Sequence, residues 1–307
     1  MLNYAIRRIL GAIPTLFIII TLTFFLIRLA PGGPFDQEQT LPPEIEANLK
    51  AAYHLDKPMW VQYGYYLSNL ARGDFGPSFK FKDFTVTQLI WQGFPVSMRI
   101  GMTAMLVALV AGIGLGSLAA LRQNSRTDYS VMTVAMVGVA IPNFVVAPLL
   151  SLIFGIYLGW LPVAGWNDGA LSNLVLPVTA LSLPYIAYIA RLTRGSMIEV
   201  LGTNYIRTAR AKGLPERTVI TRHAFKAALL PVVSFLGPAT ARIISGSLVI
   251  EQIFGLPGIG RYFVQGALNR DYTLVMGVVI FYATLIIVFN LIVDLVYAWL
   301  DPRVQYE

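Results

Sequence analysis

Four ionisable side chains lie inside long apolar blocks of the sequence, where a charge is costly and therefore points to function. Arg28 and Arg99 fall near the ends of their blocks, so we expect both guanidinium groups to reach the membrane surface. Arg242 falls deeper, about 20 Å from the first residue of its block at a rise of about 1.5 Å per residue. It can face a transport pathway and meet a substrate carboxylate, or it can pair with a partner subunit. The sequence leaves both roles open.

Asp294 is the fourth of these residues, near the end of the last apolar block, and Asn290 precedes it by one helical turn on the same face. The depths of Asp294 and Arg242 differ too much for an ion pair, so we expect structural roles for Asp294 and Asn290. Another block is interrupted by Pro142. A proline frees a backbone carbonyl group, which is tolerated where a helix is buried or lines a cavity. The adjacent Asn143 is therefore a second pathway candidate beside Arg242.

Motifs for enzymatic chemistry are absent from the sequence. It has no G-x-x-x-x-G-K-[ST] phosphate loop, no H-E-x-x-H and no G-x-S-x-G, so we expect no ATPase or hydrolase activity by these routes. Cysteine is absent, and His54 and His223 fall on opposite sides of the expected membrane. Gly112 and Gly116 lie in an apolar block and form a small-xxx-small face for close helix packing. We expect no catalytic residue, metal site or cofactor in this chain.

Long apolar segments must position these residues. Of the 307 residues, 56% are hydrophobic and 13% are charged, whereas a soluble domain has about a quarter charged residues. A helix needs roughly 20 mainly apolar residues to cross a membrane. Six segments meet this condition: 9–29, 96–121, 131–158, 174–190, 229–250 and 274–300. We therefore expect an all-α integral membrane protein with six transmembrane helices.

Lysine and arginine indicate the orientation, because cytoplasmic loops carry an excess of both. Arg7 and Arg8 precede the first span, and eight such residues lie in 191–226, whereas 160–173 has none. Both termini are thus expected in the cytoplasm, and the net charge of +7 reflects topology rather than nucleic-acid binding. The first span exceeds the roughly 7–15 apolar residues of a secretory signal, and no A-x-A pattern follows, so we expect it to be retained.

The segment 31–95 is too long for a simple connection, so we expect an extracytoplasmic domain. Proline and glutamate at 42–44 predict a helix start, and a second helix is expected from about Pro58. The expected apolar faces are Ile45, Leu49, Ala52 and Tyr53 on the first helix, and Trp60, Tyr63, Leu67 and Leu70 on the second. The domain caps the membrane helices, and it can also offer a docking surface to an extracytoplasmic partner.

The segment 191–226 carries the main pattern. A run of good helix formers ends at Gly213, where a helix can stop in the left-handed conformation. Pro215 and Glu216 then restart a helix, with proline in the first turn and an acid near the positive end of the dipole. Small residues such as Ala209 are expected to keep the surface low, so that a partner can approach closely. Taken alone, the pattern also fits a solvated basic loop.

The run YIRTARAKGL, at 205–214, resembles the EAA loop of ABC permeases in the version found in the peptide and nickel importer family. The general pattern is E-A-A, three residues, Gly, nine residues and I-x-L-P. Gly213 matches the Gly and Ala209 the second Ala, whereas Arg207 and Thr208 replace the first two residues and the I-x-L-P end is not matched. These departures are those of the peptide and nickel subgroup.

Three further runs, at 53–79, 255–272 and 291–306, are similar to segments of the same family, so the resemblance covers nearly the whole chain. It implies the ABC importer permease fold, divided into 1–30, an extracytoplasmic insertion at 31–95 and a transmembrane domain at 96–307. It also implies a coupling helix that fits a groove on an ATPase subunit. The residues of that helix are Arg207, Thr208, Ala209, Arg210, Ala211, Lys212, Gly213, Leu214, Pro215, Glu216 and Arg217.

The resemblance implies a passive half-channel in the bacterial inner membrane, completed by a second homologous permease. Two ATPase subunits, which hold ATP and Mg, and an extracytoplasmic peptide-binding protein are implied as further partners. Oligopeptides are the expected substrate, and dipeptides, glutathione and nickel are the alternatives within the family. The rival class is a self-sufficient secondary transporter, which would need a complete ion or proton site in one chain.

Overall fold

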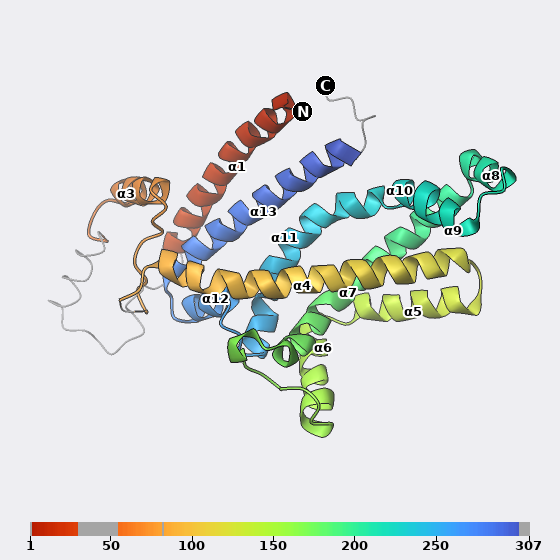
Figure 1. The fold of residues 1–307 in the computed structure, drawn as a ribbon. Coiled ribbons are helices and arrows are strands. Elements are labelled where there is room, and N and C mark those ends of the chain that lie inside the picture. The colour runs from red at the N-terminus through yellow and green to blue at the C-terminus, as the bar shows by residue number, and fades with distance from the viewer. Residues whose placement is uncertain (1, 30–54, 82, 301–307) are drawn as a thin grey trace.

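The computed structural model describes residues 2–29, 55–81 and 83–300, and the regular elements of this part are all helices (Figure 1). The expected all-α membrane protein is therefore confirmed. Within the described ranges, five helices are long and apolar enough to cross a membrane. They are α1 (Leu2–Leu29), α4 (Val86–Leu121), α7 (Leu171–Leu201), α11 (Leu230–Ile253) and α13 (Tyr272–Leu300).

The third expected span is bent rather than straight. α5 (Arg126–Ala140) meets α6 (Asn143–Leu150), which continues as the π-helical turn η1 (Ser151–Tyr157), at an angle of 101°. Ile141 is extended, with φ −92° and ψ 119°, because a following proline disfavours the helical conformation. The expected third span, 131–158, is therefore a bent pair of helices, and the described residues hold up to six spans when this pair counts as one.

Two spans, α4 and α7, extend about ten residues beyond one end of their apolar segments. α4 begins at Val86 because Thr85 and Gln88 form a capping box: Thr85 Oγ1 accepts from Gln88 N at 3.2 Å, and Gln88 Oε1 accepts from Thr85 N at 2.9 Å. α7 continues to Leu201, so Arg194 belongs to a helix instead of the expected loop. Hydropathy does not reveal such extensions, because polar residues are also good helix formers.

α3 (Met59–Ala71) begins directly after Pro58, as the sequence predicts. Three of the residues expected on its inner face pack with α1 and α13: Tyr63, Leu67 and Leu70. Trp60 is 75% exposed, but its ring meets the Phe25 ring of α1 edge-on with ring centres 5.5 Å apart, and Tyr66 is the buried residue of this helix. The first helix expected in this segment, with Ile45, Leu49, Ala52 and Tyr53, lies outside the described residues.

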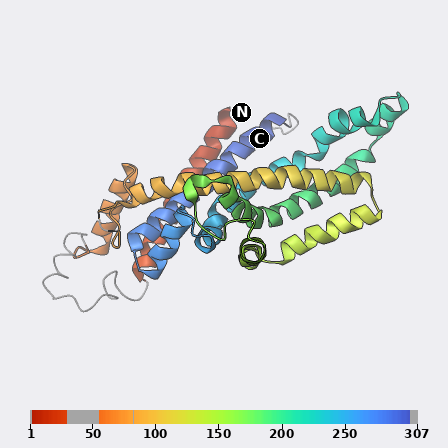
Figure 2. The same ribbon diagram turned by 60° about the horizontal axis from the view of Figure 1, so that its bottom comes forward.

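α4 and α7 form the centre of the molecule and run side by side (Figures 1 and 2). Gly112 and Gly116 of α4 face α7. A Cβ atom on Gly112 would lie 2.8 Å from Cβ of Ile189, and one on Gly116 would strike the carbonyl oxygen of Ala190. Because Gly112 and Gly116 have no side chains, α4 and α7 can approach each other closely. This close approach increases the van der Waals contact between the two helices.

The helices gather at two ends of the molecule (Figure 1). α3, the short helix α12 (Ile259–Leu268) and the first turns of α4 lie toward one end. The last turns of α4 and α7 lie at the other end, and the first turns of α1 and the last turns of α13 point away from α3. The candidate functional residues are distributed between these two ends.

Candidate functional site

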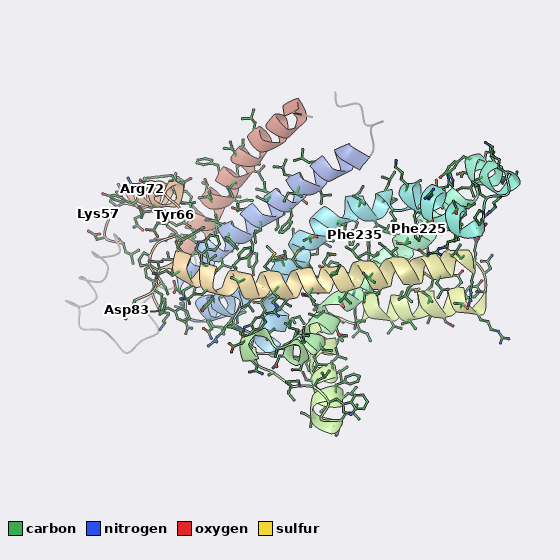
Figure 3. All side chains as sticks on the ribbon, in the orientation of Figure 1. Lys57, Tyr66, Arg72, Asp83, Phe225 and Phe235 are labelled. Carbon is green, nitrogen blue, oxygen red and sulfur yellow. The ribbon has the colours of Figure 1, made fainter. Side chains whose placement is uncertain are left out.

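At the end of α7 the chain folds into a small helical unit, residues 202–228, which we call the tip (Figure 1). It consists of α8 (Asn204–Ala211), α9 (Glu216–Thr218), the π-helical turn η3 (Val219–Ala224) and α10 (Phe225–Ala228). Phe225, labelled in Figure 3, lies where the tip leads into α11. The tip projects from the bundle at the end opposite to α3.

Gly213 makes the turn between α8 and α9. Its φ is +76°, the left-handed conformation that the sequence predicts, and a Cβ atom there would meet nothing within 4 Å. Gly213 N donates to the Arg210 carbonyl at 2.9 Å, and Leu214 N donates to the Ala209 carbonyl at 3.4 Å. These bonds satisfy carbonyl groups that the end of α8 would otherwise leave open. Pro215 then precedes α9, as expected.

The tip has an apolar inner face and a basic outer face. Ile206 is fully buried and Ala209 is 6% exposed, and both pack against Met197 of α7 and Val219 of η3. The expectation that Ala209 forms part of a low outer surface is therefore wrong. A bulky residue there would disrupt the tip itself. The outer face is made of exposed residues: Arg207, Thr208, Arg210, Ala211, Lys212, Gly213, Leu214, Pro215, Glu216 and Arg217.

Arg210 and Glu216 form a bidentate ion pair across the turn. Arg210 Nε donates to Glu216 Oε2 at 3.1 Å, and Nη2 donates to Oε1 at 2.6 Å. The hydrogen bonds from Arg210 hold the pKa of the Glu216 carboxyl below its usual value. Because both side chains are well exposed, such a pair contributes only about 0–1 kcal/mol. The ion pair orients the turn, because its two hydrogen bonds fix α9 relative to α8.

A second ion pair, which the sequence analysis missed, joins the beginning of α5 to α7. Arg194 Nε lies 2.5 Å from Asp128 Oδ1, and Nη2 donates to Oδ2 at 2.7 Å. Asp128 is buried, and the backbone N–H of Asn124 also donates to it, at 2.9 Å. The sequence signal was an N-cap serine followed by an acid three residues later: Ser125 Oγ accepts from Asp128 N. The pair connects the bent span to the helix that carries the tip.

Arg28 and Arg99 both donate hydrogen bonds to other parts of the protein, and the expectation that their guanidinium groups reach the membrane surface stays a prediction. Arg99 Nη2 donates to the Gly169 carbonyl at 3.0 Å, and its guanidinium lies 5.7 Å from the ring centre of Trp166. Arg28 Nη1 donates to the side-chain oxygen of Gln62 on α3. The Arg28 contact ties α1 to α3, and the Arg99 contact ties α4 to the turn Asn167–Gly169.

The two pathway candidates lie on neighbouring helices. Asn143 is the first residue of α6 and is half-buried, and Arg242 is exposed on α11, which contacts α6. Within the described part of the chain, the Arg242 side chain makes no hydrogen bond or ion pair. Asn290 is half-buried on α13, and its Oδ1 has no hydrogen-bond partner there. The side chain of Asp294 lies outside the described side chains.

Two buried acids stabilise the connection from α11 through α12 to α13, and sequence reasoning assigned neither. Glu251 accepts from Ser247 Oγ at 2.5 Å and from Gly260 N at 2.8 Å. Asp271 accepts from Ser78 Oγ at 2.5 Å and from several backbone N–H groups. Hydropathy does not show which acidic side chains will find hydrogen-bond donors.

Two family comparisons bear on this arrangement. Residues 112–306 match the family described as binding-protein-dependent transport system inner membrane component. Residues 1–100 match the family of its N-terminal part. The chain belongs to this family. It is a membrane-spanning permease component of an ABC-type transport system, and the resemblance drawn from 205–214 is confirmed.

Three relatives match this chain over nearly its whole length. The chain is 60% identical over 306 residues to the oligopeptide transport system permease protein OppB of Escherichia coli, with 100% of both chains covered. It is 56% identical to OppB of Haemophilus influenzae, again with 100% of both chains covered. The dipeptide transport system permease protein DppB of Bacillus subtilis is 45% identical, covering 99% of this chain and 98% of the relative.

Solved structures share the fold. A chain of the MetNI methionine ABC transporter, in inward-facing conformations, superposes with a TM-score of 0.57 at 16% identity. It covers 70% of this chain, and this chain covers 97% of it. A chain of an amino acid ABC transporter superposes with a TM-score of 0.56 at 16% identity, covering 69% of this chain and 94% of that one. The expected ABC permease fold is therefore confirmed.

Proposed function

We propose that the permease takes oligopeptides across the inner membrane as one half of an ATP-driven translocation pathway. The identity of 60% to a permease named for oligopeptide transport, against 45% to one named for dipeptide transport, favours this substrate. A second, homologous permease forms the other half of the pathway. Arg242 and Asn143 are the residues of this half that meet the substrate.

The exposed basic face of the tip carries the proposal, because it offers an ATPase a projecting and well-defined surface. The turn at Gly213 and the Arg210–Glu216 pair shape this surface, and α7 connects it to the bundle. Two ATPase subunits bind ATP and Mg and press on the tips of the two permeases. Closure of the ATPases moves each tip, and each tip moves α7 and α11.

The topology follows from the same assignment. The tip and both chain termini lie in the cytoplasm, and the insertion at 31–95 lies outside. The gathering of α3 and α12 at the end opposite to the tip supports this orientation. An extracytoplasmic peptide-binding protein docks at that end and delivers the substrate.

Reconstitution of this permease with the other permease, the two ATPases and the binding protein tests the function. We expect ATP-dependent uptake of a labelled pentapeptide that stops when the binding protein is omitted. If the complex took up a dipeptide in preference to the pentapeptide, the substrate would be assigned to dipeptides. The relative at 45% identity is named for dipeptide transport. Uptake by this chain alone, without an ATPase, would show a secondary transporter instead.

A further inference from the structure

A cavity of about 210 Å³ lies between the last turns of α1, the helix α3 and the first turns of α13. Its walls combine a cation, several polar side chains and aromatic rings. Tyr66, which belongs to this wall, is labelled in Figure 3; it lies on α3, next to α1. The transport function proposed above uses none of these residues.

Arg28 is the charged group of the cavity, and it has no counter-ion among the described residues. Its guanidinium lies 5.2 Å from the ring centre of Phe24, and its Nη1 donates to Gln62. Its Nε is buried and has no hydrogen-bond partner in the described part of the chain. A half-buried cation without an anion is costly, and a bound anion would remove much of that cost.

The surroundings hold Arg28 in one orientation. Gln62 donates through Nε2 to the carbonyl of Lys57 at 2.8 Å and to that of Leu55 at 3.3 Å, so its side-chain oxygen is turned toward Arg28. Since Gln62 occupies Nη1, the edge formed by Nε and Nη2 is left without a hydrogen-bond partner among the described residues. That edge presents two parallel N–H groups, the geometry that matches two oxygens of a phosphate.

Two further groups of the cavity can donate to the same anion. The hydroxyl of Tyr66 is buried and has no hydrogen-bond partner within the described ranges. The amide of Asn69 also lines the cavity. Asp271 does not line the cavity, and its carboxylate accepts from Ser78 and from backbone N–H groups.

The depth of Arg28 matches that of lipid headgroups. The apolar stretch Leu10–Leu29 has 20 residues, and about 30 Å of helix is the thickness of the hydrocarbon layer. Arg28 lies at the end of this stretch, beside Leu26 and Leu29, which are 64% and 72% exposed. Aromatic rings such as those of the cavity wall are enriched at this level of a membrane.

We propose that this cavity binds a phosphate group, carried by a phospholipid headgroup or present as free inorganic phosphate. Arg28 supplies the charge and two N–H donors, Tyr66 adds its hydroxyl, and Gln62 orients Arg28. The outward position of the site rests on the proposed topology, but binding itself requires neither transport nor ATP. A failure of the importer assignment is therefore distinguishable from a failure of this site.

Thermal unfolding of the purified complex in a phosphate-free detergent tests the site. The probes are dihexanoyl phosphatidylglycerol, inorganic phosphate and dihexanoylglycerol, which has the same acyl chains without phosphate. We expect phosphatidylglycerol to raise the melting temperature of the wild-type complex with saturation. Arg28→Gln should raise the half-saturating concentration about tenfold to a hundredfold, because a hydrogen-bonded charge is lost.

Two more variants distinguish a loss of phosphate binding from a loss of folding. Tyr66→Phe removes one hydroxyl at constant shape and should weaken binding without lowering the melting temperature of the lipid-free complex. Arg72→Gln removes an exposed charge at the end of α3, outside the cavity, and should bind as the wild type does. Figure 3 labels both Tyr66, on α3, and Arg72, directly after the end of α3.

The probes separate the two sources of phosphate. A shift with phosphatidylglycerol alone identifies a lipid headgroup site, and an equal shift with inorganic phosphate identifies a site for the free ion. An equal shift with dihexanoylglycerol would mean that acyl chains alone fill the cavity, and the proposal would be wrong. It would also be wrong if no probe shifts the melting temperature, or if Arg28→Gln binds like the wild type.

Discussion

The turn at Gly213 allows a single substitution to change the shape of the tip without touching the bundle. Gly213 has φ +76°, and a side chain there would point into open space. The cost of Gly213→Val is therefore a cost of backbone conformation alone. Placing a non-glycine residue in the left-handed region costs about 2 kcal/mol, and a β-branched residue costs more. A cost of about 2 kcal/mol lowers the population of the native turn, relative to other conformations, by about thirtyfold.

A turn that leaves this conformation loses specific contacts. The bond from Leu214 N to the Ala209 carbonyl depends on it, and so does the Arg210–Glu216 pair, whose partners stand on either side of Gly213. The buried inner face of the tip contains Ile206 and is not altered. We expect Gly213→Val to insert and assemble normally but to lose peptide uptake, with ATPase activity that is lost or independent of the binding protein.

Gly213→Asn is the matched control. Asparagine also adds a side chain at the same open position, but it enters the left-handed region several-fold more readily than most residues. Uptake and ATPase activity, with and without the binding protein, should be near wild type in reconstituted vesicles. Wild-type coupling in Gly213→Val would refute the role of the tip. Equal failure of both variants would show that side-chain bulk, rather than backbone conformation, causes the defect.

Three further changes test other parts of the molecule. Cysteine in place of Leu171, which is 77% exposed, should react with an impermeant reagent from outside, whereas cysteine in place of Tyr205 should react only after the membrane is opened. Asp128→Asn should lower the free energy of unfolding by about 3 kcal/mol, measured by thermal unfolding, because it leaves Arg194 without its carboxylate. Arg242→Ala should lower peptide uptake while assembly and basal ATPase activity stay intact.

Each of these has a contrary outcome. The reverse labelling pattern would invert the topology. Asp83→Asn is the control for Asp128, because Asp83 is exposed and its φ of +71° suits asparagine; it should change stability by less than about 0.5 kcal/mol. Equal melting temperatures for the two variants would show that the buried pair contributes nothing. Loss of assembly in Arg242→Ala would make Arg242 a residue that pairs with a partner subunit.

Local sequence was sufficient for the helices and for the turn of the tip. A membrane span depends on the apolar content of about 20 consecutive residues, so five of the six expected spans correspond to long helices. Gly213 and Pro215 act within a few residues of their own positions, because each restricts its own backbone. The family resemblance also rests on short runs, and it held over the full chain.

Tertiary structure decided which polar residues meet and which small residues are buried. Asp128 and Arg194 come from different helices, and no local pattern states that they will face each other. Ala209 was expected on the surface, yet helix periodicity cannot say which face of α8 packs against α7. The burial of Glu251 depends on donors that only the folded connection brings to it. Hydropathy averages a segment along the chain, whereas a buried charge is stabilised by partners that the chain supplies only once its helices have packed.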